Sequence, residues 1–328
     1  MMYILPDKMA ARCLHWSLGE SMETRREQWR FSASNGEGDI VAHVWLPEEP
    51  IALLQIVHGM SEHGARYDEF ARFLNRYGFA VLADDHAGHG QSAQGHLGAY
   101  AASAGGFDHA AQDLHQLFDL ATERVGTLPC LMFGHSMGSV MSALYAERHS
   151  GLTALIMSGT PSAIQFSHLF QFLAGCIAAT RGHLAASPLL ERLTGSVAKL
   201  SPDEAARVRV WLSRDAEKVR EFGSDPLCGF DYTAGGYYAM FRGYHHVNAK
   251  DWGRRIPDIP ILIVAGADDT SSGSGKGPTR YAAQLTKTGH SHVDLKLFPE
   301  CRHELVNELN REEIFAYLCD WLKERLSF

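Results

Sequence analysis

The feature that most constrains the fold of this chain is the alternation of short apolar segments with helical patterns. Most of the apolar segments end in Gly, His, Ser or Asp, as buried parallel strands do where they reach the carboxyl edge of a sheet. They are IALLQIVHG (51–59), FAVLADD (79–85), LPCLMFGHS (128–136), LTALIMSGT (152–160), IPILIVAGADD (259–269) and HVDLKLFPE (292–300). The helical patterns lie at 67–77, 107–125, 137–148, 278–286 and 311–326. This alternation predicts a mostly parallel, doubly wound α/β sheet with helices on both faces.

The N-terminal part adds two strands of a different kind. EQWRFSAS (27–34) and DIVAHVWL (39–46) alternate apolar and polar residues across the turn-forming NGEG, which predicts an antiparallel hairpin and about eight strands in all. Residues 1–24 match no core element, so we expect a leader, and Met22 is an alternative start. The leader lacks the pattern of a secretory signal, which favours a cytoplasmic protein, with peripheral contact at membranes left open.

The interval 161–255 interrupts the alternation. It contains no clear strand pattern, only helical segments such as SHLFQFLAGCIAAT (167–180) and SPDEAARVRVWLSRDAEKVREF (201–222). We therefore expect a helical cap over 161–255, inserted into a core made of 25–160 and 256–328. One face of the first helix carries Phe166, Phe170, Leu173 and Ile177. That face either packs on the core or faces lipid or an acyl chain, and polar residues interrupt it too often for a membrane span.

Composition excludes one large class of function. The 328 residues carry a formal net charge of −8 and show no basic segment, which argues against binding of nucleic acid. The six cysteines are scattered without C-x-x-C spacing, so neither a disulfide framework nor a zinc site is predicted. The sequence does not indicate the oligomeric state.

A Gly-x-Ser-x-Gly motif lies at the junction of one predicted strand and one predicted helix. In LMFGHSMGSV (131–140), Ser136 is flanked by Gly134 and Gly138, and this context favours a nucleophile over a serine that merely fits a turn. A serine hydroxyl needs a histidine base and a carboxylate that orients it. The strand ending in GADD offers Asp268 and Asp269, and the segment after the last strand offers His303. The order Ser, Asp, His predicts a catalytic triad.

Several longer segments carry a family resemblance. They are VHGMSEHGARYDEFARFLNRYGFAVLADDHAGHGQSAQG, GHSMGS, SDPL, GADD and RHELVNE. Together they resemble the monoacylglycerol lipase and lysophospholipase group of α/β-hydrolases, whose relatives are also classed as serine aminopeptidase-like. The resemblance implies the α/β-hydrolase fold with an inserted cap, and it favours Asp269 over Asp268 as the acid because the family's acid stands three residues after the glycine.

The resemblance also assigns supporting residues. It implies that the backbone N–H groups of Met60 and Met137 form the oxyanion hole, which would stabilise the charge that develops on the substrate carbonyl. It implies that Glu62, Arg66 and His135 contact the substrate. For Glu62 and Arg66, the alternative is an ion pair at the surface that does not contact the substrate.

A cluster of Asp84, Asp85, His86 and His89 resembles a metal site only superficially. In the family this loop is structural, with polar side chains that bind backbone groups, and the residue spacing offers no face with three ligands. We therefore expect no metal and no cofactor.

These observations predict a serine hydrolase that acts on a carboxylic ester through an acyl-enzyme. The substrate expected is a single-chain glycerolipid, either a monoacylglycerol or a lysophospholipid, with its acyl chain under the cap and transient contact between the cap and a membrane surface. The alternatives are a peptidase or acyltransferase with the same triad, and a catalytically silent fold that binds a ligand.

Overall fold

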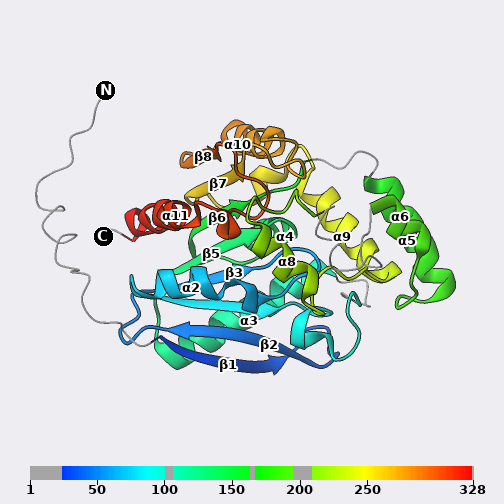
Figure 1. The fold of residues 1–328 in the computed structure, drawn as a ribbon, viewed down its shortest axis with the longest axis horizontal. Coiled ribbons are helices and arrows are strands. Elements are labelled where there is room, and N and C mark those ends of the chain that lie inside the picture. Colours follow the sequence, from blue (N-terminus) through cyan, green and yellow to red (C-terminus); the bar gives the residue numbers. More distant parts are fainter. Residues whose placement is uncertain (1–23, 100–105, 163–166, 195–208, 327–328) are drawn as a thin grey trace, which may run out of the picture.

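A single eight-stranded sheet organises the protein, as a computed structural model of the chain shows (Figure 1). The structure describes residues 24–99, 106–162, 167–194 and 209–326. The strand order is β1-β2-β4-β3-β5-β6-β7-β8. The bounds are β1 Arg25–Ser32, β2 Asp39–Leu46, β3 Ala52–Val57, β4 Phe79–Asp85, β5 Cys130–His135, β6 Leu152–Ser158, β7 Ile261–Gly266 and β8 Val293–Phe298. β1 and β2 form the predicted antiparallel hairpin, and the strands from β4 to β8 in this order run parallel.

Two layers of helices cover the sheet. On one face lie α2 (Asp68–Asn75) and α11 (Arg311–Arg325), and on the other lie α3 (Phe107–Val125), α4 (Met137–Arg148) and α10 (Lys276–Thr288). Short 3-10 helices occur at Gly64–Tyr67, Gly90–Ala93, Trp252–Arg255 and Leu305–Asn307. The prediction of an α/β-hydrolase fold is confirmed.

The apolar runs form strands because both faces of the sheet are covered. In β3, Leu53 and Val57 point into the apolar cluster beneath α3 and α4, whereas Leu54 and Ile56 point into the cluster beneath α2 and α11. All four side chains are buried. A strand buried on both faces reads as a continuous apolar run rather than an alternating one.

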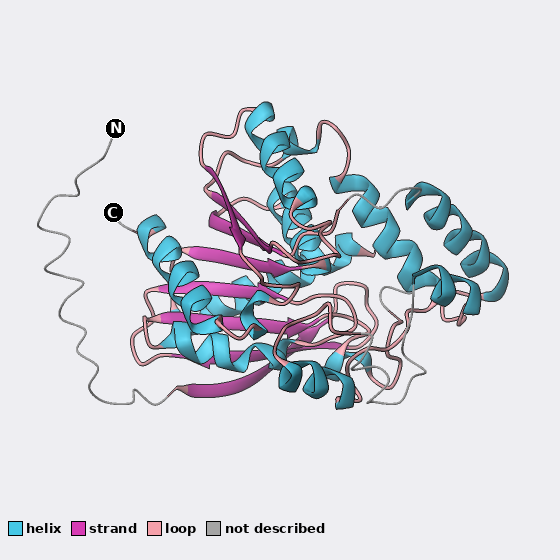
Figure 2. Ribbon diagram, turned by 45° about the horizontal axis from the view of Figure 1, so that its top comes forward, coloured by secondary structure: helices cyan, strands magenta, loops and turns pink. Residues whose placement is uncertain are grey.

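Further helices stand between β6 and β7 in the chain. They are α5 (Ser167–Arg181), α6 (Pro188–Thr194), α8 (Ala216–Ser224) and α9 (Ala234–Val247). α5 and α6 project beyond the sheet in Figure 2 and Figure 1, and α5 packs on α9, with ring centroids of Phe170 and Phe241 5.5 Å apart. Phe166 lies outside the described residues. In the described ranges, no helix combines the length and apolar character needed to cross a bilayer.

The prediction of a helical segment over 201–222 is wrong over residues 209–215. That segment forms turns rather than a helix, and residues 201–208 lie outside the described residues. The helix begins only at Ala216 because the side chain of Asp215 accepts the backbone N–H groups of Glu217 and Lys218, which makes Asp215 the N-cap. The backbone before it is engaged by the loop after β8: the N–H of Glu304 donates to the carbonyl of Leu212 at 2.7 Å.

Candidate active site

Ser136 lies on a strained turn between β5 and α4. Its backbone φ is +51°, a region that non-glycine residues rarely adopt, and its N–H donates to the carbonyl of Ser158 at 2.8 Å. The two flanking glycines are required by close backbone approach. A Cβ on Gly138 would overlap the carbonyl oxygen of Val57, and one on Gly134 would lie 2.5 Å from the carbonyl oxygen of Gly138. The local sequence therefore produces a turn that presents Ser136 at the N-terminus of α4.

His303 and Asp269 are joined by a buried hydrogen bond. Nδ1 of His303 lies 2.9 Å from Oδ2 of Asp269, and the N–H of Ser271 donates to the other carboxylate oxygen at 2.9 Å. Asp268 is exposed instead. Burial opposes charge on both partners, but their mutual attraction outweighs it: the pKa of His303 is raised and the pKa of Asp269 is lowered. The arrangement fits a histidine base whose tautomer is fixed by a carboxylate.

Ser136 and His303 line the same cavity, which has a volume of about 720 Å³. His135 lines it too, with its ring centroid 4.8 Å from that of His303. Burial, followed by the nearby His303, lowers the pKa of His135 to about 4, so this ring is neutral near pH 7. The cavity thus brings together Ser136, His135 and His303, and two further predicted residues, Met60 and Glu62, line it as well.

Met60 and Met137 occupy different settings near Ser136. Met60 is half-buried and lines the cavity, whereas the side chain of Met137 is buried and accepts a hydrogen bond from the hydroxyl of Tyr232 at Sδ, 3.2 Å away. Met137 is the first residue of α4, so its backbone N–H has no partner within the helix. The loop that carries Met60 is held by Glu62, whose Oε1 accepts the N–H of Gly59 at 2.5 Å.

Glu62 and Arg66 belong to a buried ion cluster with Glu304, so the surface alternative for this pair is wrong. Arg66 donates to both carboxylate oxygens of Glu304, at 2.8 and 2.9 Å, and also to Glu62. Burial opposes the charges, but pairing with Arg66 lowers the pKa of Glu304 to about 2. Glu62 and Glu304 line the cavity, and Arg66 is not among its lining residues. Sequence analysis missed Glu304, although it directly follows His303.

The cavity has two walls of different character. α5, α6 and α9 contribute an apolar wall, made of Phe170, Leu190, Leu193, Tyr237, Met240, Phe241 and Tyr244. The other wall comes from residues before α8, on it and after it, namely Arg209, Trp211, Leu212, Phe222, Gly229, Phe230 and Asp231. The second wall is also largely aromatic and aliphatic, but it carries two charged residues, Arg209 and Asp231, which the first wall lacks.

The second wall touches His303 directly. The N–H of His303 donates to the carbonyl of Trp211 at 3.3 Å, and the two rings lie 5.0 Å apart between centroids. Sequence analysis missed Trp211 because the segment had a helical pattern. This contact holds the backbone of His303 against the segment that precedes α8.

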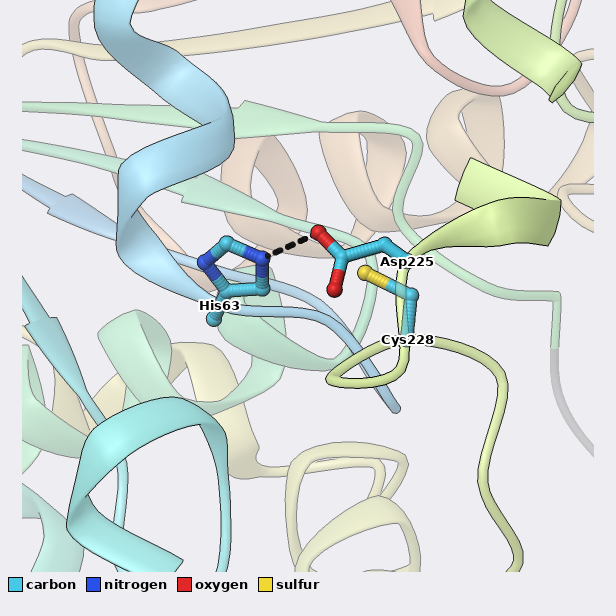
Figure 3. A group of neighbouring side chains, drawn as sticks. All are labelled: His63, Asp225 and Cys228. Atoms are coloured by element: carbon cyan, nitrogen blue, oxygen red, sulfur yellow. Dashed lines mark hydrogen bonds and ion pairs between the residues drawn. The ribbon is translucent and has the colours of Figure 1, made fainter. Parts of the chain in front are cut away.

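His63, Asp225 and Cys228 form a group of possible metal ligands (Figure 3). Their ligand atoms lie within 4.8 Å of one another, and Nε2 of His63 is 3.0 Å from Oδ2 of Asp225. Burial raises the pKa of the Cys228 thiol, which disfavours the thiolate that binds metals. The nearby cation of Arg66 acts in the opposite direction on this pKa, but burial outweighs it. The hydrogen bond in Figure 3 instead ties the loop after β3 to the segment after α8.

The last two residues of β4, Asp84 and Asp85, bind backbone and histidine partners. Asp85 accepts the N–H groups of Gly64 and Gln91 at 2.9 and 2.8 Å, and Asp84 lies 2.7 Å from Nδ1 of His86. Asp85 therefore links the loop after β3 to the loop after β4.

Comparisons with known proteins identify the family of the chain. The family model described as serine aminopeptidase, S33, matches residues 48–310. The chain is 26% identical to the monoacylglycerol lipase of Mycolicibacterium smegmatis, covering 88% of this chain and 94% of that protein. It is 29% identical to the human monoglyceride lipase, covering 84% and 87%. Among solved structures, a thermostable carboxyl esterase from Bacillus coagulans in complex with glycerol superposes with a TM-score of 0.80 at 27% identity, covering 93% of this chain and all of that one.

Proposed function

Because this chain belongs to the serine aminopeptidase S33 family and is a carboxylic-ester hydrolase of the lipase and esterase type, we propose that it hydrolyses single-chain glycerolipids at Ser136. The observation that carries the proposal is the buried hydrogen bond between His303 and Asp269, in a cavity that Ser136 also lines. The named relatives are monoacylglycerol and monoglyceride lipases, which supports a glycerol ester with one acyl chain.

The first half of the mechanism forms an acyl-enzyme. The Ser136 hydroxyl attacks the ester carbonyl while Nε2 of His303 takes its proton, and Asp269 stabilises the resulting imidazolium. The backbone N–H groups of Met60 and Met137 donate to the oxyanion. The C–O bond to the glycerol then breaks as His303 returns the proton to the leaving oxygen.

The second half releases the fatty acid. Water takes the place of the glycerol, His303 accepts its proton, and the hydroxide attacks the acyl carbon. When the tetrahedral intermediate collapses, the bond to Ser136 breaks and the serine oxygen regains the proton. The apolar wall formed by α5, α6 and α9 supports an acyl chain lying beneath those helices.

The two halves of the substrate take opposite sides of the cavity. His303 protonates the leaving oxygen, so the glycerol must lie on the side of His303, which Trp211 and Leu212 flank. The acyl chain extends along the apolar wall instead.

A substrate panel tests the proposal against its alternatives. Monooleoylglycerol, oleoyl lysophosphatidylcholine and an aminoacyl anilide are compared by kcat/KM, with and without an added alcohol acceptor. We expect one or both lipids to be cleaved at least a hundredfold better than the anilide, with fatty acid as the main product. Preferential cleavage of the anilide would make the protein a peptidase, and transfer to the alcohol would make it an acyltransferase. Absence of turnover, with no labelling of Ser136 by a fluorophosphonate, would fit a silent fold.

A further inference from the structure

Arg209 is a buried cation in the second wall of the cavity. Its side chain lines the cavity although the residue is only 5% exposed. No described carboxylate lies within ion-pair distance of its guanidinium, and the hydrogen bond from its Nη2 to the carbonyl of Gly229 is long at 3.5 Å. Its other contact is the ring of Phe222, 5.1 Å away. Within the described chain, Arg209 is the sole arginine or lysine that lines this cavity.

Arg66 is a second arginine in this region, and it differs from Arg209 because it is paired with carboxylates. Arg66 also lies over the ring of Phe222, at 4.7 Å, but it pairs with Glu304 and Glu62. Burial opposes both charges, yet the carboxylates raise the pKa of Arg66, whereas burial prevails and lowers the pKa of Arg209. A buried charge is costly until an opposite charge meets it. The protein supplies that charge for Arg66, and the described residues do not supply it for Arg209.

The position of Arg209 decides which part of a substrate it meets. The N–H of Leu212 donates to the carbonyl of Arg209 at 2.9 Å and closes a turn. The carbonyls of the last two residues of this turn accept the N–H groups of His303 and Glu304. Because His303 protonates the leaving oxygen, this turn borders the leaving group rather than the acyl chain. The acidic residues nearby are engaged: Glu62 and Glu304 bind Arg66, and Asp231 has an interaction of its own.

We propose that Arg209 binds a phosphate on the head group of the substrate, so that the preferred ester is a lysophospholipid rather than a neutral monoacylglycerol. This inference rests on the proposed function. A guanidinium binds phosphate oxygens through charge-assisted hydrogen bonds, and each such contact in a buried site strengthens binding by roughly tenfold to a hundredfold. The phosphate would supply the negative charge that no described residue places beside the guanidinium of Arg209.

The test compares two esters with the same acyl chain, 1-oleoylglycerol and 1-oleoylglycerol 3-phosphate. The measured quantity is the ratio of kcat/KM for the phosphate ester to kcat/KM for the neutral ester. We expect Arg209→Gln to lower this ratio at least tenfold and Arg209→Lys to lower it much less. Arg220→Gln is the matched control, because Arg220 is exposed on α8 and does not line the cavity, and it should keep the wild-type ratio.

Inhibition by small anions shows whether the site recognises the head group or any free phosphate. Glycerol 3-phosphate should inhibit the wild type more strongly than inorganic phosphate or glycerol, and Arg209→Gln should weaken that inhibition. The proposed head-group site would be wrong if Arg209→Gln lowered kcat/KM equally on the two esters, or if inorganic phosphate inhibited as strongly as glycerol 3-phosphate. Either outcome would leave the proposed ester hydrolysis intact. Inactivity of the wild type on both esters would overturn the proposed function itself.

Discussion

Arg66 and Glu304, 238 positions apart in the chain, form a two-pronged buried ion pair beside His303. The pair joins the loop that carries Met60 to the loop that carries His303, because Arg66 also binds Glu62 and Glu304 directly follows His303. The two loops hold the proposed oxyanion donor and the proposed base. Their relative position therefore depends on one guanidinium.

Removing the charge of Glu304 should weaken both folding and catalysis. In Glu304→Gln, Arg66 keeps only Glu62, and partial loss of a buried ion pair costs about 2 to 3 kcal/mol of unfolding free energy. We expect kcat to fall as well, because the His303 loop loses its anchor. Chemical denaturation and fatty-acid release measure the two effects. Glu300→Gln is the control, since Glu300 is exposed and its loss should change stability by less than about 0.5 kcal/mol. A Glu304→Gln variant as stable and active as this control would refute the anchoring role.

The pH dependence should report the pairing of His303 with Asp269. A protonated imidazole cannot act as the base, and the pKa of His303 is raised above its ordinary value of 6.5 because Asp269 outweighs burial. The rate constant kcat/KM should therefore rise with pH through a pKa above 6.5. Asp269→Asn should move this limb to lower pH and reduce kcat by about 10⁴-fold, as in other triads. If the pKa of this limb were the same in Asp269→Asn as in the wild type, the limb would belong to a group other than His303.

The turn at Ser136 should not tolerate a side chain at Gly138. A Cβ there would overlap the carbonyl oxygen of Val57, which belongs to a buried strand that cannot move away. Gly138→Ala should cost several kcal/mol or prevent folding. The control is Gly151→Ala, where no atom lies within 4 Å and only the positive φ imposes a cost, of about 1 kcal/mol. Thermal unfolding measures the stability of the two variants. Equal melting temperatures would show that a Cβ at position 138 does not clash with the carbonyl oxygen of Val57.

The exposed apolar residues of α5 predict binding to lipid surfaces. Leu169 and Phe172 are 55% and 70% exposed on this helix, near the cavity's apolar wall. Placing each in a bilayer interface is worth about 2 kcal/mol, so replacing both by serine should reduce sedimentation with zwitterionic vesicles more than tenfold. Leu309→Ser removes an equally exposed leucine elsewhere and should have little effect. Wild-type protein that stays in the supernatant would remove this prediction.

Much of the fold follows from local sequence patterns. The runs that end in Gly, His, Ser or Asp became parallel strands, and the predicted helices 107–125 and 137–148 have the observed bounds of α3 and α4. These patterns are informative because a sheet covered on both faces requires continuous apolar runs. The approach of His303 and Asp269 also follows from them, since the carboxyl ends of neighbouring parallel strands meet at one edge.

The supporting contacts of the site could not be predicted in this way. Trp211 belongs to a segment with a helical pattern, but its backbone carbonyl binds the N–H of His303 instead, and tertiary hydrogen bonds override local propensity. The pairing of Arg66 with Glu304 joins positions far apart in the chain and has no local signal. Arg209 is equally hidden, because a net charge of −8 says nothing about one buried cation.

The most direct test of the central claim is fatty-acid release from monooleoylglycerol and its 3-phosphate by the wild type and by Ser136→Ala. We expect the wild type to release oleate from at least one ester. We expect Ser136→Ala to lose activity at least a thousandfold while its circular dichroism spectrum shows that it is folded. Ser136→Ala should also lose labelling by a fluorophosphonate. If the folded variant released oleate at the wild-type rate, Ser136 would not be the nucleophile and the account would be wrong.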